Sequence, residues 1–237
     1  MPWKARLLRL VAPQRDAERE IRGFAGQLDE ALQAVRGGEL AKAHDLFWDI
    51  AEKARSPELA AAARHGLGWT MMLQGDLDNA AAVLSDNETR FVIAHRLNNI
   101  SASTAVDLAL VHGLRGDVRQ AEMWLHRAHA RRSLSVSSSI DATIAFSRSV
   151  WLCRSGRSPE AAKLLDDGWA GYEAALTGDV LRPLRVVRAF AHATGPRSGG
   201  VAAAALPTLR PAYPGEYTYL GTKWPEMAVF LATHELA

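Results

Sequence analysis

Apolar residues recur every three or four positions along most of the chain. Between about residues 16 and 36 they form a single stripe, made of Ile21, Phe24, Leu28, Ala31, Leu32 and Val35. This spacing predicts an amphipathic helix. Gly37 and Gly38 end it, and a second helix is predicted from about Leu40 to Arg55. The N-terminal part of the chain therefore predicts two helices that pack together around a glycine turn.

The same turn returns at a nearly constant interval. A glycine is followed five residues later by an alanine in the pairs Gly38/Ala43, Gly75/Ala80, Gly116/Ala121 and Gly156/Ala161. These glycines lie 37, 41 and 40 residues apart, and Gly195 follows after a further 39. Such a period is typical of repeat proteins, in which each helix pair buries its apolar face against the next. We therefore expect about five pairs, the fifth being degenerate, with its second helix from Val201 to Leu209.

Residues beside the turns are suited to starting helices. Gly75 can adopt the left-handed conformation that ends one helix, and Asp76 can accept from the first N–H groups of the next. Similar caps are predicted at Ser56 before Pro57, at Asp117 with Gln120, and at Ser158 before Pro159. By contrast, the polar run from residue 85 to 88, Ser-Asp-Asn-Glu, predicts a break in the second helix of the second pair.

Residues 64–87 carry the sharpest motif, Gly66-Leu67-Gly68-Trp69 followed by Gly75 and Ala80. It resembles the tetratricopeptide repeat (TPR), and the resemblance extends over roughly residues 24–168. The chain departs from the usual 34-residue period, and Leu108-Ala109 replaces Leu-Gly in the third unit. The longer units look like those of TPR domains in bacterial regulators. The resemblance implies an all-α protein, an α-solenoid that forms a right-handed superhelix of about five TPR-like helix pairs.

This interpretation divides the chain into three parts. Residues 1–22 form a basic amphipathic arm or helix, residues 23–210 the TPR-like repeat domain, and residues 211–237 an ordered loop and a C-terminal capping helix. We expect the capping helix from about Lys223 to Leu236, covering the final repeat. The arm could pack against the first repeat, lie in the groove of the superhelix or act as a partner-binding or membrane-surface helix; packing at the end is favoured.

In the TPR family the first helix of each unit lines the concave surface. We number the residues of each repeat so that its turn glycine is position 15. Positions 5, 9 and 12 of the first helices then form a candidate partner-binding groove, which is apolar in the middle and basic at its C-terminal end. Its residues are His65, Trp69, Met72, Leu110, Phe146, Val150 and Arg185. We interpret this surface as a groove for a peptide or helical segment of a protein partner. The alternative, ordinary packing between helices, fits the same residues.

Composition and charge narrow the choice of partner. A formal net charge of +2 gives no strong field for polyanions, which disfavours nucleic acid. Two arginine clusters nevertheless leave RNA binding as a second alternative; they include Arg119, Arg127 and Arg132, and Arg182, Arg185 and Arg188. Cys153 fits a buried thiol in a reducing compartment, and no stretch approaches the roughly 20 apolar residues of a transmembrane helix. We therefore expect a cytoplasmic protein, and the bias towards alanine and arginine suggests a bacterial one.

Known catalytic signatures are missing from the sequence. It contains no phosphate-binding glycine loop, nucleophile elbow or His-Glu-x-x-His motif. His126 and His129 lie on one predicted helix face but have no carboxylate or thiol at ligand spacing. We therefore expect no metal, no cofactor and no enzymatic activity. The favoured hypothesis is a protein-protein interaction adaptor, and the alternative is a regulatory sensor whose groove binds a small peptide or metabolite. An apolar groove also leaves a homodimer open.

Overall fold

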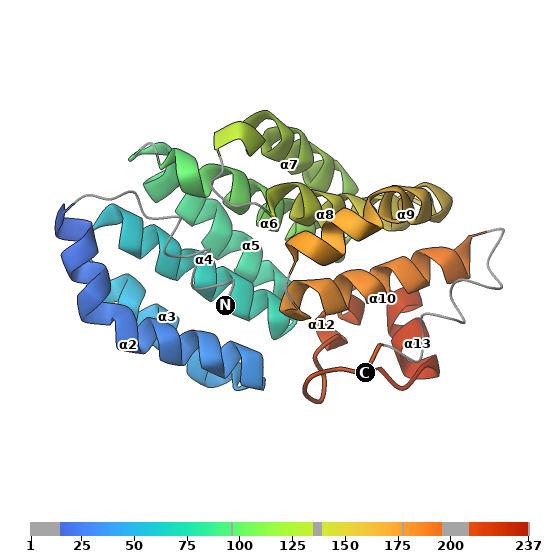
Figure 1. Cartoon of the computed structure of the whole chain (residues 1–237), viewed down its shortest axis with the longest axis horizontal. Helices are drawn as coiled ribbons and strands as arrows, with labels where there is room; N and C mark the ends of the chain where they lie inside the picture. Colours follow the sequence, from blue (N-terminus) through green and yellow to red (C-terminus); the bar gives the residue numbers. More distant parts are fainter. Residues whose placement is uncertain (1–14, 96, 135–138, 177, 196–208, 237) are drawn as a thin grey trace.

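The structure, a computed structural model, describes residues 15–95, 97–134, 139–176, 178–195 and 209–236. Every regular element within these ranges is a helix, so the chain is all-α (Figure 1). The helices are α2 (Arg15–Gly37), α3 (Leu40–Lys53), α4 (Pro57–Leu73), α5 (Leu77–Asn87), η1 (Glu88–Ile93), α6 (Asn98–Arg115), α7 (Val118–Arg131), η2 (Arg132–Leu134), α8 (Ile140–Arg154), α9 (Ser158–Ala175), α10 (Gly178–Thr194), α12 (Thr218–Gly221) and α13 (Pro225–Thr233). No helix among the described residues is long and apolar enough to cross a membrane.

The helices pack mainly against their neighbours in the sequence. Contacts join α2 to α3, α4 to α5, α6 to α7, and α8 to α9. The first helix of each pair also contacts the first helix of the next, so that α2, α4, α6, α8 and α10 touch in succession. One apolar cluster runs through all these elements and on into α13.

Four turns within this array have the same backbone geometry. Gly38, Gly75, Gly116 and Gly156 all have positive φ, between +72° and +84°. At each turn the glycine N–H donates to the carbonyl three residues earlier, and the next N–H donates to the carbonyl five residues earlier, at 2.8 to 2.9 Å in the second case. This is the Schellman arrangement, which satisfies carbonyls at the end of a helix. The predicted left-handed turns are therefore confirmed, and each would be strained by any residue with a Cβ.

Small residues on α4 allow its neighbours to approach closely. A Cβ added at Gly66 would lie 2.6 Å from the Phe47 ring on α3, and one added at Gly68 would lie 2.6 Å from Leu84 Cγ on α5. Neither distance is tolerated between carbon atoms, so both positions require glycine for this packing. The predicted role of Gly68 in close helix contact is confirmed.

The predicted helix caps are correct in two places and wrong in two. Ser56 Oγ accepts from the Leu59 N–H at 3.0 Å, and the Asp76 carboxylate accepts from the Asn79 N–H at 3.3 Å. Asp117 makes no such bond, because its carboxylate lies 3.4 Å from His112 Nδ1 instead. Ser158 is already inside α9 and is buried, so it does not cap that helix.

The break predicted at residues 85–88 is wrong. α5 continues directly into the π-helix η1, which ends at Ile93. Two polar residues of this run, Asn87 and Glu88, are buried because distant helices supply their partners: the Asn87 side-chain amide donates to the Ala61 carbonyl at 3.0 Å, and the Glu88 carboxylate accepts from Arg131 on α7 at 2.5 Å. Both side chains are at most 2% exposed.

The segment from Leu209 to Leu236, here called the C-terminal segment, covers α10 as expected. Trp224 and Phe230 meet the Phe190 ring edge-on, with centroids 4.9 and 5.6 Å away. Its second helix, α13, is shorter than predicted, and a short helix, α12, occupies part of the region expected to be a loop.

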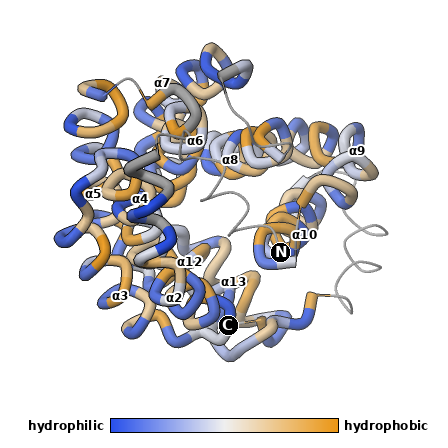
Figure 2. Tube along the Cα trace, turned by 60° about the vertical axis from the view of Figure 1, so that its left-hand side comes forward, coloured by the Kyte–Doolittle hydropathy of each residue, from blue (hydrophilic) through white to orange (hydrophobic). Residues whose placement is uncertain are grey.

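The C-terminal segment also reaches back to the first two turns. The Tyr213 ring covers Gly38, so that a Cβ added at Gly38 would lie 2.6 Å from the ring. Thr222 covers Gly75, and a Cβ added at Gly75 would lie 2.7 Å from Thr222 Oγ1. Lys223 pairs with Asp78. Figure 2 shows that the helices follow a curved path, with α2 near one end of the path and α10 near the other. The short helices α12 and α13 lie between α2 and α10.

The predicted domain boundaries change at the N-terminal end. α2 runs without interruption from Arg15 to Gly37, so the division between residues 22 and 23 falls inside a helix. Residues 1–14 of the predicted arm, residues 201–208 of the predicted fifth second helix, and residues 135–138 lie outside the described residues.

Candidate binding site

Most side chains predicted to line a groove lie inside the molecule. Trp69 is 6% exposed, and the others on α4, α6 and α8 are at most 2% exposed; these are His65, Met72, Leu110, Phe146 and Val150. Val150 packs closely on α6, since a Cβ at Gly113 would lie 3.2 Å from its Cγ1. In this structure these six residues contribute helix packing, so the expectation that they form an exposed groove needs correction.

The seventh predicted residue, Arg185, is partly exposed on α10, where it pairs with Glu173 at 3.1 Å. Its neighbours are also neutralised: Arg188 pairs with Asp166 at 2.7 Å and Arg182 with Glu216 at 2.6 Å. The basic end predicted for the groove is therefore a set of ion pairs that connect α10 to α9 and to the C-terminal segment.

His65 has a structural partner that the sequence did not indicate. Its Nε2 is hydrogen-bonded to Asp107 Oδ2, and the side chains are 0% and 4% exposed. The two residues lie 42 positions apart, close to one repeat, on the stacked helices α4 and α6. A buried carboxylate requires a partner that compensates its charge or satisfies its oxygens. His65 thus joins two repeats and does not reach a surface.

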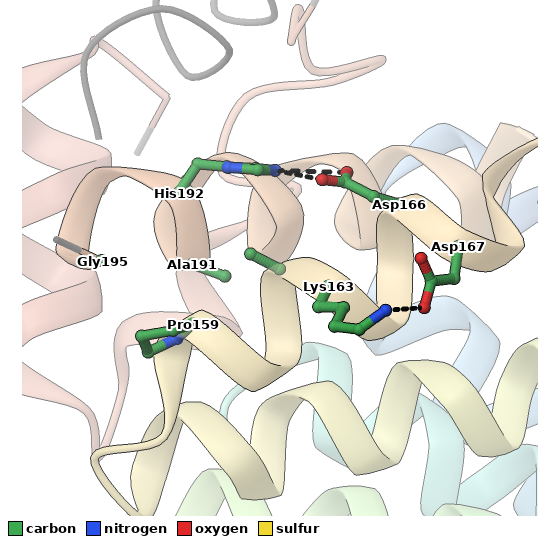
Figure 3. A pocket seen from close by; sticks show the side chains of 8 residues that line it. Pro159, Lys163, Asp166, Asp167, Ala191, His192 and Gly195 are labelled. Carbon is green, nitrogen blue, oxygen red and sulfur yellow. Dashed lines mark hydrogen bonds and ion pairs between the residues drawn. The ribbon is translucent and has the colours of Figure 1, made fainter. Parts of the chain in front are cut away.

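A cleft of about 440 Å³ lies between α9 and α10 (Figure 3). It is lined by Pro159, Ala162, Lys163, Asp166 and Asp167 from α9, by Ala191 and His192 from α10, and by Gly195 just after α10. The α9 residues fall three or four positions apart, which places them on one helix face. Pro159 is in the first turn of α9 and Gly195 follows the last residue of α10, so the cleft reaches the point where α9 begins and α10 ends.

Ion pairs fix the charged rim of the cleft. The Asp166 carboxylate accepts from Arg188 Nε at 2.8 Å and lies 3.2 Å from His192 Nε2, and Lys163 donates to Asp167 at 2.6 Å (Figure 3). Burial raises the pKa of Asp166, but the hydrogen bonds from Arg188 and His192 outweigh it and hold the pKa below its ordinary value. The Asp167 hydrogen bond raises the pKa of Lys163. All five side chains are held in pairs of carboxylate and basic group, so the rim has no strong charge of either sign.

The cleft is suited to binding. Its floor is formed by the small apolar side chains of Ala162 and Ala191, and its rim offers hydrogen-bonding groups at fixed positions. None of the described residues that line it carries a hydroxyl or a thiol. Within the described residues, no three His, Cys, Asp or Glu side chains gather as a metal site would require.

Sequence reasoning missed the cleft because it counted α9 as an outer helix. Two signals were present: acidic residues seven apart on α9, Asp166 and Glu173, and basic residues on α10 that pair with them. These signals indicate how the helices pack. They do not indicate that the helix ends leave space between them, because that depends on the small side chains of both helices together.

Comparison of the chain with protein-family models, with curated proteins and with solved structures gives no match. The resemblance to tetratricopeptide repeats accordingly rests on the residues of the repeat alone.

Proposed function

We propose that this chain is a non-enzymatic protein-protein interaction adaptor, built as a right-handed α-solenoid of TPR-like helix pairs. In this proposal, a peptide segment of its partner binds in the cleft between α9 and α10. The cleft carries the proposal: its volume of about 440 Å³ lies in the range of ligand-binding pockets, roughly 300 to 1,000 Å³.

Two observations support the solenoid. The Schellman turn recurs at Gly38, Gly75, Gly116 and Gly156 with one geometry. The first helices also contact each other in succession from α2 to α10. Stacked helix pairs are an architecture that protein partners commonly bind, because the array presents an extended surface on rigid elements.

The cleft is a better candidate than the predicted groove because the side chains on its rim are accessible. Lys163, Asp167 and Pro159 are exposed, whereas the six groove residues on α4, α6 and α8 are not. A peptide could place one apolar side chain beside Pro159 and Ala162 and donate or accept hydrogen bonds at the rim. Rim groups already held by ion pairs lose little further conformational entropy on binding.

A steric block of the cleft tests this proposal. Ala162→Phe directs a ring into the empty volume, and Ala170→Phe is the matched control, because Ala170 is exposed on the same helix but does not line the cleft. Peptides selected from a random display library on the wild-type protein should lose at least about tenfold in affinity for Ala162→Phe and bind Ala170→Phe normally. Equal binding to both variants would remove the cleft from the proposal.

A regulatory sensor is the second candidate, and the size of the same cleft favours it. In that case the ligand is a small peptide or metabolite, and its binding to the folded state raises the melting temperature. The measurement is a thermal-shift screen of peptide and metabolite pools with wild-type protein and Ala162→Phe. A shift that occurs only with the wild type, from a compound too small to be part of a protein, selects the sensor over the adaptor.

A further inference from the structure

The outer face of α7 carries basic side chains that the proposed function does not use. Arg119, Met123 and Arg127 are exposed and follow each other at four-residue intervals, which places them in one line on the helix. Arg132 after α7 and Arg148 on α8 are also exposed. Arg119, Met123 and Arg127 are here called the α7 face. From Arg119 to Arg127 it extends for about 12 Å along the helix.

Within the described part of the chain, both arginines of the α7 face, Arg119 and Arg127, form no ion pair within 4.0 Å, and neither does Arg148 on α8. Arg132 reaches Asp141 at 3.8 Å, a long contact between two exposed groups. The arginines of α10 differ, because Arg182, Arg185 and Arg188 each have a carboxylate partner. The α7 face therefore retains positive charge that the fold does not neutralise.

One nearby acidic group, Glu160, is hydrogen-bonded to another arginine, and the charge of Arg148 also lowers its pKa. Arg157 donates two hydrogen bonds to the Glu160 carboxylate. These bonds raise the pKa of Arg157, and the negative charge of Glu122 raises it slightly further. Burial lowers the pKa of His129 in α7, and the positive charges of Arg148 and Arg132 lower it further. Arg148 and Arg132 thus lie close enough to act on the same imidazole.

Two features distinguish a protein partner from a nucleic acid. Met123, in the centre of the line, is 36% exposed and offers an apolar contact between the arginines. Trp124 is only 7% exposed, and the Arg127 guanidinium lies over its ring with 4.5 Å from Cζ to the ring centroid. This face of the ring is therefore not open to a base, whereas proteins that bind single strands combine a basic groove with aromatic rings on which bases stack.

We propose that the α7 face binds an acidic amphipathic segment of a protein, with an apolar side chain on Met123 and carboxylates on Arg119 and Arg127. Charge complementarity selects this partner, because guanidinium groups match carboxylates in geometry as well as in charge. The stacked Arg127 is held in place before binding, so less side-chain entropy is lost. This surface is separate from the α9–α10 cleft, so the two proposals can fail independently.

The probe is a fluorescein-labelled helical peptide of about 15 residues, composed of Glu and Leu in amphipathic order. It should bind the wild-type protein with an affinity that falls as salt is added. Charge reversal by Arg119→Glu with Arg127→Glu should weaken binding at least about tenfold. The matched control is Arg22→Glu with Arg210→Glu, which makes the same change of charge at exposed positions elsewhere and should leave most of the affinity. Circular dichroism verifies that all variants fold.

Two further probes test the apolar contact and the class of partner. A peptide with Ser in place of Leu should bind severalfold more weakly, and Met123→Ser should remove that difference. A single-stranded RNA of equal net charge should bind more weakly than the Glu–Leu peptide. The proposal is overturned by the absence of peptide binding at low salt, by equal binding to the Arg119→Glu/Arg127→Glu variant, by equal binding of the Ser peptide, or by tighter binding of the RNA.

Discussion

The same substitution, glycine to alanine inside a helix, should have opposite effects at two positions of this protein. Gly26 lies within α2 with no atom within 4 Å of an added Cβ. Gly68 lies within α4, where the added Cβ would be 2.6 Å from Leu84 Cγ and 2.8 Å from Leu84 Cδ2. The comparison isolates the close approach of α4 and α5 from the helix propensity that both substitutions share.

The magnitudes follow from two opposing effects. Replacing an interior helix glycine by alanine stabilises a helix by about 1 kcal/mol, so Gly26→Ala should be more stable than the wild type by about that amount. At Gly68 an overpacking cost opposes this gain. Leu84 is 1% exposed and cannot move aside, so the cost should lie near the upper end of the usual range, about 3 kcal/mol. Gly68→Ala should then be less stable than the wild type by about 2 kcal/mol.

The assay is chemical and thermal unfolding followed by far-ultraviolet circular dichroism. For a chain of this length, 1 kcal/mol corresponds to about 2–4 °C, so the two variants should differ by about 6–12 °C in melting temperature. The double variant Gly68→Ala/Leu84→Ala should lose less stability than the two single losses added together, because the new methyl group fills part of the cavity. A Gly68→Ala protein as stable as the wild type would refute the close approach of α4 and α5.

Three further predictions concern a cap, a thiol and a buried ion pair. Ser56→Ala should lower the free energy of unfolding by about 1 kcal/mol, because it removes the acceptor for the Leu59 N–H; an unchanged urea midpoint would contradict this. Burial raises the pKa of Cys153 to about 12, so the native thiol should not react with an aromatic disulfide reagent at neutral pH, and rapid labelling without unfolding would show that it is accessible. The folded state holds the thiol proton more tightly than the unfolded state does. This contribution to stability is therefore complete below the unfolded pKa of 9.0 and is lost as the pH rises towards about 12. In alkaline unfolding curves, Cys153→Ala should lose less stability over this pH range than the wild type does. Arg131→Met should destabilise by about 3 kcal/mol, because it leaves the buried Glu88 carboxylate without its cation; adding Glu88→Gln should restore part of the loss, and failure to do so would refute the coupling.

The turns could be predicted from the sequence because their causes are local. A left-handed glycine ends a helix through bonds to carbonyls three and five residues earlier, so the period of the glycines determines where the helices end. Ser56 before Pro57 is a local signal of the same kind, and it holds. Ser158 before Pro159 has the same residue types, but there the chain is already helical at Ser158.

The interior of the array could not be predicted in this way. The polar residues Asn87 and Glu88 suggested a break, yet they are buried because partners 26 and 43 residues away satisfy them. The register placed Phe146 and Val150 on a concave surface open to a partner, but both are at most 2% exposed, because the register alone does not show whether that face meets solvent. That depends on the curvature of the whole array, which no single repeat encodes. The α9–α10 cleft was missed for the same reason.

The contact between Lys223 and Asp78, residues 145 positions apart, has a consequence for how this protein folds. An open repeat array unfolds gradually from its ends, since each unit depends only on its neighbours. Here the C-terminal segment covers the turns at Gly38 and Gly75 and also packs on α10, so neither end can fray without losing contacts to the other. Melting should therefore approach a single cooperative transition. During synthesis the first repeats must wait for this segment before they reach full stability, and such long-range closure slows folding relative to an open array.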